Sequence, residues 1–200
     1  VLEQGWTEPL VVGSLAAVVL VAHKKPNWLP WAVGLLVAVK QYTVFMVPLA
    51  LLLVPREHWK QPKALLDFAW KAALPALLVT LPFVLWSPKD FWFDVAQLQV
   101  LQPFRDESLS FLAWWKQQNG VQPSTAWAFV MAALAVGVSL WRGARDITGF
   151  VAAIAATYLF FFAFNKQAFC NYYYFVIGAS ALGAVLATRS EAGAPSAAKA

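Results

Sequence analysis

Charged residues are scarce in this chain. Lys, Arg, Asp and Glu make up 12% of the 200 residues, whereas apolar residues make up 60%. An average soluble domain carries about 25% charged residues. This shortage excludes an ordinary soluble domain, and we expect an integral membrane protein of the all-α class, built as a bundle of transmembrane helices.

Residue sets that support common chemistry are also missing. Cys170 has no second cysteine with which to form an internal disulfide, and neither His23 nor His58 has another ligand at metal-binding spacing. The chain has no Walker or Rossmann glycine pattern and no Ser-His-Asp set. We therefore expect no metal, no disulfide and no cofactor. These patterns do not identify a catalytic residue.

Six hydrophobic segments dominate the sequence: residues 9–22, 31–54, 72–86, 126–141, 147–164 and 169–188. A helix crosses a hydrocarbon core with about 20 residues. We expect residues 1–188 to form a multi-pass transmembrane domain, and residues 189–200, which have little bulky apolar surface, to form a disordered cytoplasmic tail. Because the chain begins at Val1 without a signal pattern, we expect it to be the C-terminal part of a longer membrane protein.

The segment 31–54 contains Lys40, Gln41 and Tyr42 and allows two topologies. If it crosses once, Pro48 marks a kink, and the loop lysines and arginines divide almost evenly between the two sides. If it is a re-entrant hairpin that turns at residues 40–42, most of them collect on one side. The positive-inside rule then favours the hairpin and identifies that side as cytoplasmic. The basic side holds Lys24, Lys25, Arg56, Lys60, Lys63, Lys71, Arg142, Arg145, Arg189 and Lys199. This pattern explains the net charge without a nucleic-acid partner.

Lys40 is expected to lie deep in the membrane under either topology. An ionisable group there costs at least about 2.5 kcal/mol, so it usually faces a cavity or a partner. One interpretation is that Lys40, Gln41 and Tyr42 bind an anionic, hydrogen-bonding ligand such as a lipid phosphate or a sugar. The other is that Lys40 snorkels, or that it pairs for structural reasons with a glutamate from the part of the protein that precedes this chain.

The outer side carries further candidate binding residues. Glu8 begins the first apolar segment, either as a site residue or as a favourable charge at a helix N-terminus. Residues 87–120 form an outer loop, which we expect to start with an interfacial amphipathic helix whose capping box joins Ser87 and Asp90. Arg105 follows, as a phosphate ligand or as part of a surface salt bridge.

A last polar cluster lies at residues 165–176, between the two final segments. It contains Lys166, Gln167, Asn171 and Tyr172, although tyrosines are common at membrane interfaces without a further role. Lys166 and Gln167 repeat the Lys-Gln pair at residues 40–41, so the two pairs are candidates to frame one cavity. The same dipeptide recurs at residues 60 and 116, so composition alone also accounts for the repetition.

The hairpin region resembles a known family. It consists of a basic loop (HKKPNW), a short apolar stretch (LPWAVGLLVAV), Lys40-Gln41-Tyr42, an apolar stretch with a proline (FMVPLALLLV) and a second basic loop (PREHWKQPK). This order is similar to the membrane hairpin of GT-C-type glycosyltransferases, and in particular of bacterial polyprenyl-phosphate-mannose-dependent mannosyltransferases. The resemblance extends over about two thirds of the chain.

The resemblance implies an inverting, multi-pass enzyme of the bacterial inner (plasma) membrane. It would transfer a sugar, with mannose expected, from a polyprenyl-phosphate donor to a glycan, lipid or protein acceptor on the outer face. Lys40, beside Gln41 and Tyr42, would then stabilise the departing phosphate with help from Arg105 or Lys166. The family's catalytic acid is expected in an outer loop that precedes this chain.

Two other function classes fit the same sequence. Discontinuous hydrophobic segments and membrane lysines also occur in transporters, so a flippase of a lipid-linked sugar is the main rival. A non-catalytic subunit of a membrane assembly is the third, and it would tolerate alanine at both Lys-Gln pairs.

Overall fold

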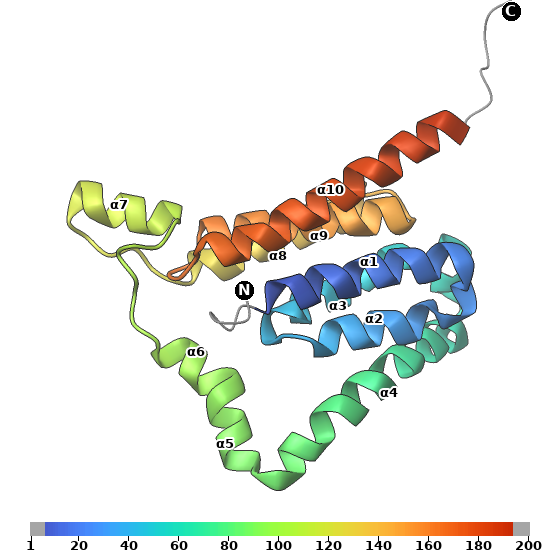
Figure 1. Cartoon of the computed structure of the whole chain (residues 1–200), viewed down its shortest axis with the longest axis horizontal. Helices are drawn as coiled ribbons and strands as arrows, with labels where there is room; N and C mark the ends of the chain where they lie inside the picture. The colour runs from blue at the N-terminus through green and yellow to red at the C-terminus, as the bar shows by residue number, and fades with distance from the viewer. Residues whose placement is uncertain (1–6, 194–200) are drawn as a thin grey trace, which may run out of the picture.

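The computed structural model describes residues 7–193, with side chains to residue 189. All regular structure in these residues is helical (Figure 1), which confirms the all-α class. The longer helices are α1 (Glu8–Lys24), α2 (Leu29–Ala38), α4 (Pro62–Trp86), α7 (Phe111–Asn119), α8 (Trp127–Arg142), α9 (Ile147–Ala163) and α10 (Cys170–Gly193).

Five of the predicted hydrophobic segments each form one helix: α1, α4, α8, α9 and α10. Two boundaries differ from the prediction. Helix α4 begins at Pro62 rather than near residue 72, because Pro62 stands at the first helical position and the polar residues after it are compatible with a helix. Helix α10 continues to Gly193, so the expected disordered tail was wrong for residues 189–193. Residues 194–200 lie outside the described part of the chain.

The segment 31–54 reverses direction instead of forming one helix. Its first arm is α2, and its second consists of a 3₁₀ turn (Gln41–Phe45), α3 (Met46–Leu49) and another 3₁₀ turn (Ala50–Leu53). The arms meet at Lys40, whose backbone is extended (φ −156°, ψ 150°). The Thr43 hydroxyl shares its proton between the carbonyl oxygens of Val37 (2.6 Å) and Lys40. These carbonyl groups lie at the break, where regular α-helical hydrogen bonds stop.

In both arms of this hairpin, the end that is far from Lys40 lies at the same end of the helical bundle. There the second arm places Leu52 beside Gly143, and Trp59 stacks on the Arg145 guanidinium at 4.1 Å. Helices α1 and α10 also finish at this end. We call it the basic end, defined by Lys24, Lys25, Arg56, Lys60, Arg142, Arg145 and Arg189. The reversal that the hairpin interpretation requires is therefore present, and a single helix over residues 31–54 is not.

The core lies between α1, α9, α10 and the hairpin. Helix α9 is buried along most of its length and contributes Phe150, Ile154, Tyr158 and Phe162. Much of the outer surface is apolar as well, especially on α4 and α8. The residues 62–86 and 170–189 form helices that are long and apolar enough to span a membrane.

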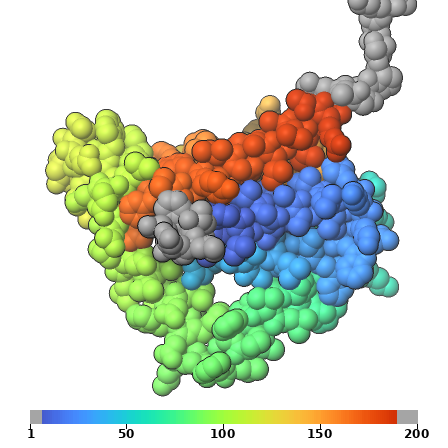
Figure 2. Space-filling model, viewed as in Figure 1, coloured from blue at the N-terminus to red at the C-terminus, as the bar shows by residue number. Residues whose placement is uncertain are grey.

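Helix α4 packs against α2 near Ala72 and Pro75, but its last part and the segment after it lie away from the bundle (Figure 1). The segment 88–101 joins α5 (Pro88–Trp92), a π-helical turn (Phe93–Gln97) and α6 (Leu98–Leu101) into one outer arm. Figure 2 shows a gap between this arm, α4 and the bundle. Ser87 precedes the arm, as predicted, but its hydroxyl donates to the Asp90 carboxylate (2.6 Å) rather than capping backbone amides. The predicted capping box is therefore not formed.

The packing of α4 against α2 depends on Gly34. A Cβ atom at this position would lie 2.0 Å from the Ala72 carbonyl oxygen and 2.7 Å from Pro75 Cγ. Small residues allow this close approach of two helix backbones.

We predict that Gly34→Val separates these two helices and lowers the free energy of unfolding by about 1–3 kcal/mol. Denaturant unfolding in detergent micelles would measure this loss. Gly13→Ala is the matched control, because no atom lies within 4 Å of the Cβ position there. Equal stability of Gly34→Val and Gly13→Ala would contradict the packing role.

Candidate binding cavity

A cavity of about 540 Å³ lies at the end of the bundle opposite the basic end. Its volume is in the range of about 300–1,000 Å³ that is usual for small-molecule sites. Five parts of the chain form it: the turn after α2, the outer arm, the start of α8 with the loop before it, the end of α9 with the loop after it, and the start of α10.

The cavity lining separates into an apolar wall and a polar rim. The wall is largely aromatic and includes Phe45, Phe129, Phe161 and Phe162. The rim contains lysine, amide, hydroxyl and phenol groups. The polar lining residues are Lys40, Gln41, Tyr42, Gln99, Gln102, Ser124, Thr125, Asn165, Lys166, Gln167 and Tyr172. Such a lining suits a ligand with an apolar part and a polar, anionic part.

The structure brings both predicted Lys-Gln pairs to this one cavity, at residues 40–41 and 166–167. Tyr42 and Tyr172 line it as well, whereas Glu8 and Asn171 are not among its lining residues. The Lys-Gln pairs that begin at residues 60 and 116 also lie outside the cavity lining. Proximity does not test ligand binding, so the binding role of these residues stays a prediction.

Lys40 has a partner inside the protein. Its ammonium forms an ion pair with the Glu8 carboxylate, and the two side chains are 22% and 1% exposed. The Lys40 Nζ atom also lies 5.2 Å from the ring centre of Tyr42 and 5.4 Å from that of Tyr172. Lys40 therefore pairs with a glutamate rather than reaching alone towards water, but the glutamate is Glu8 of this chain and not, as expected, a residue that precedes it. The charge of Lys40 is compensated before any ligand binds.

Glu8 is more than a favourable charge at a helix N-terminus, because its side chain is fully enclosed. One carboxylate oxygen accepts a hydrogen bond from Lys40, and the other has no hydrogen-bond partner among residues 7–189. Asn171, at the start of α10, lies beside this carboxylate. The Glu8 side chain therefore connects α1, the hairpin turn and the start of α10.

Tyr42 fixes the turn by packing. Its ring lies against Tyr158 at 5.4 Å and Phe162 at 5.5 Å, both edge to face. The Tyr158 hydroxyl donates to the Tyr42 carbonyl oxygen (2.7 Å). The Tyr42 hydroxyl is buried and has no hydrogen-bond partner in the described part of the chain, so it is an unused hydrogen-bonding group next to the cavity.

Lys166 and Gln167 join the loop after α9 to the end of the outer arm. The Lys166 ammonium donates to the carbonyl oxygens of Val100 (2.9 Å) and Gln102 (2.7 Å), and the Gln167 amide donates to that of Pro103 (3.0 Å). Burial lowers the pKa of the Lys166 ammonium below its ordinary value of 10.5. Among the described residues no carboxylate pairs with Lys166, so its positive charge is uncompensated.

Arg105 lies outside the cavity lining. Its guanidinium pairs with Glu107 at 3.6 Å, and both side chains are mostly exposed. Only its backbone approaches the site, through an amide that donates to the Lys166 carbonyl oxygen (3.1 Å). The surface salt bridge is therefore the arrangement found, and the proposed phosphate contact has no support from its position.

Sequence reasoning missed two polar lining residues at the end of the outer arm, Gln99 and Gln102. They follow Val95, which also lines the cavity, by four and seven residues, so ordinary helical spacing could have placed all three on one face. The arm also contains a π-helical turn at residues 93–97, which no pattern in the sequence signals.

Comparisons with protein-family models, with curated proteins and with solved structures find no match for this chain. The resemblance to GT-C-type glycosyltransferases therefore stays a prediction.

The Glu8–Lys40 pair can be tested by a double-mutant cycle. Glu8→Gln or Lys40→Met alone leaves one buried group without its partner, and we expect each to cost about 3 kcal/mol or more. The double variant removes both charges and should cost less than the sum of the two. Denaturant unfolding in detergent would measure all three variants.

The exposed ion pair between Lys116 and Asp106, at 2.6 Å, is the control for this cycle. We expect its coupling free energy to stay below about 1 kcal/mol, because water screens it. Additive losses at Glu8 and Lys40 would show that the enclosed pair does not act as a unit.

Proposed function

We propose that this chain is the membrane part of a glycosyltransferase of the GT-C type, which moves a sugar, with mannose expected, from a polyprenyl-phosphate donor to a glycan or lipid acceptor. The observation that carries this proposal is the cavity itself. It combines an aromatic wall with a rim of two lysines and several amides. A polyprenyl-phosphate sugar has the matching parts, namely an apolar chain, a phosphate and sugar hydroxyls.

The proposal places the chain in a bacterial inner membrane as a multi-pass protein. Helices α1, α4, α8, α9 and α10 would cross, and the hairpin 28–54 would be re-entrant. Large apolar side chains are exposed along α4 and α8, as lipid contact requires. By the positive-inside rule the basic end would face the cytoplasm. The cavity, the outer arm and α7 would then face outward, where a lipid-linked sugar is used.

In this proposal the donor phosphate binds between Lys166 and Lys40. Lys166 is the stronger candidate, because its charge has only carbonyl partners. Lys40 would contribute when the phosphate competes with Glu8 for its ammonium. Both cations would stabilise the negative charge that grows on the phosphate as the sugar leaves.

The acceptor proton needs a base that the cavity lining does not provide. The described lining contains no Asp, Glu or His, and Glu8 is held by Lys40. A base from a preceding outer loop, as the family resemblance implies, would complete the site.

One observation favours the rival class. The ion pair of Glu8 and Lys40 is enclosed at the tip of the hairpin, and ion pairs within membrane segments often mark a transport pathway. A flippase of a lipid-linked sugar therefore remains the second candidate, with the same cavity as its binding site.

The first experiment is sugar transfer from labelled polyprenyl-phosphate mannose in membranes that contain the full-length protein. We expect Lys166→Ala and Lys40→Ala each to lower turnover about 100-fold, by analogy with the loss of one transition-state donor. Lys116→Ala is the matched control, since it also removes a Lys-Gln pair on the same side of the molecule but outside the cavity.

Each variant is compared at equal amounts of inserted protein, because Lys40→Ala leaves Glu8 unpaired. Unchanged turnover in both cavity variants would remove the lysines from the mechanism. If the wild-type protein transfers no sugar but moves labelled lipid-linked sugar across vesicles, the flippase function replaces the enzyme.

A further inference from the structure

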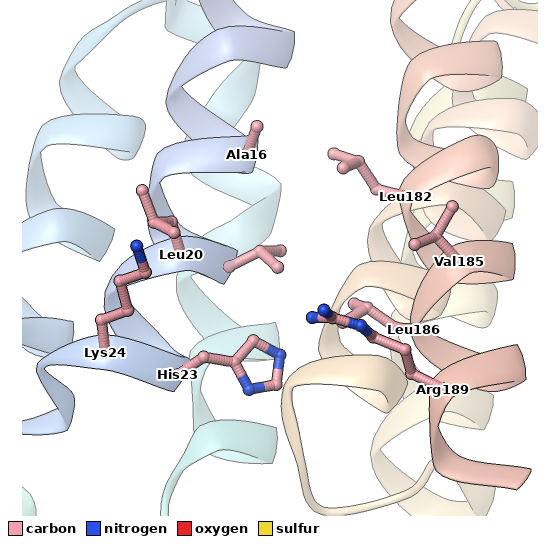
Figure 3. Close-up of a pocket in the computed structure, with 9 residues that line it drawn as sticks. Ala16, Leu20, His23, Lys24, Leu182, Val185, Leu186 and Arg189 are labelled. Atoms are coloured by element: carbon pink, nitrogen blue, oxygen red, sulfur yellow. The ribbon is translucent and has the colours of Figure 1, made fainter. Parts of the chain in front are cut away.

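A second, smaller cavity of about 250 Å³ lies between α1 and α10, near the basic end. Six of its nine lining residues are apolar, and they come from both helices: Ala16, Val19, Leu20, Leu182, Val185 and Leu186. The other three are His23, Lys24 and Arg189. Figure 3 shows the His23 and Arg189 side chains reaching from opposite helices into the space between them.

The groove exists because the two helices separate along their length. Near their other ends they touch closely, since a Cβ atom at Gly178 would lie 2.8 Å from a methyl group of Val12. Towards the basic end α10 diverges from α1 (Figure 1). A groove therefore opens between the two helices, where Leu20 and Val185 are exposed, while Val19, Leu182 and Leu186 form its floor against the core.

The charged residues at the mouth of this groove are all basic. The described lining has three basic residues and no carboxylate, and no described carboxylate pairs with Lys24 or Arg189. The remaining residues of the basic end add to the positive charge nearby. The groove is smaller than the usual cleft for a compact ligand, so it suits one narrow apolar chain with an anionic group at its end.

We propose that this groove binds an anionic glycerophospholipid. Arg189 and His23 hold the phosphate of the headgroup, Lys24 adds positive charge beside them, and one acyl chain lies between Ala16 and Leu182. The basic end is the end proposed to face the cytoplasm, and the cytoplasmic leaflet is rich in anionic lipid. This inference rests on the proposed membrane placement but not on sugar transfer, because the groove and the large cavity lie at opposite ends of the bundle.

The headgroup contact is tested with the full chain in nanodiscs that contain labelled phosphatidylglycerol in excess phosphatidylcholine. Retention of labelled lipid is measured by native mass spectrometry after release into detergent. We expect the wild-type protein to retain phosphatidylglycerol over phosphatidylcholine, and Arg189→Gln or Lys24→Gln to lower this preference at least about tenfold. Lys25→Gln is the matched control, because Lys25 is an exposed neighbour that does not line the groove.

The acyl-chain contact is tested by filling the groove while keeping its charges. We expect Ala16→Phe to abolish retention of phosphatidylglycerol. The control is Val138→Phe, which adds a similar ring on the exposed face of α8. Competition with glycerol phosphate separates a lipid site from a simple phosphate site, and we expect it to be weak.

Three results would overturn the proposal. They are equal retention of the two lipids, equal losses in Lys25→Gln and Arg189→Gln, and full displacement of the lipid by glycerol phosphate. If Ala16→Phe does not fold, as judged by its helical circular dichroism, the comparison of Arg189→Gln with Lys25→Gln decides whether the groove binds the anionic lipid. No sugar substrate is present, so failure here leaves the proposed enzyme activity untouched.

Discussion

The arrangement of the cavity end depends on the ion pair between Glu8 and Lys40. The chain must break its helix at Lys40 to form the hairpin, and this break places a cation among apolar helices. Glu8 compensates that charge from the first turn of α1, while Tyr42 and Tyr172 enclose the ammonium. One contact thus joins the start of α1 to the tip of the hairpin, and the cavity opens beside it.

The two lysines that line the cavity differ in how their charges are compensated. Lys40 is neutralised within the protein, whereas Lys166 is held by neutral carbonyl oxygens. The proposed ligand phosphate would therefore meet an uncompensated charge on one side of the cavity and a compensated one on the other. If it replaced Glu8 as the partner of Lys40, the Glu8 carboxylate would lose its ion pair while the ligand was bound.

Much of the fold could be predicted from the sequence, because hydrophobic length and loop charge are local signals. They predicted the helices and favoured the reversal at residues 40–42. The partner of Lys40 could not be predicted, since Glu8 is 32 residues away and only the packing of α1 against α2 brings the two together. The π-helical turn at residues 93–97 was also missed, because no residue type in this stretch marks it.

The outer arm gives the cavity an unusual wall. It continues from α4, which packs on the bundle mainly through α2 at Gly34, and its far end is fastened by the bonds from Lys166 and Gln167. A phosphate that drew the Lys166 ammonium away from Val100 and Gln102 would loosen that end of the arm, which the bond from Gln167 to Pro103 would still hold. If the proposed phosphate binds, occupancy of the cavity would then change how firmly its wall is held.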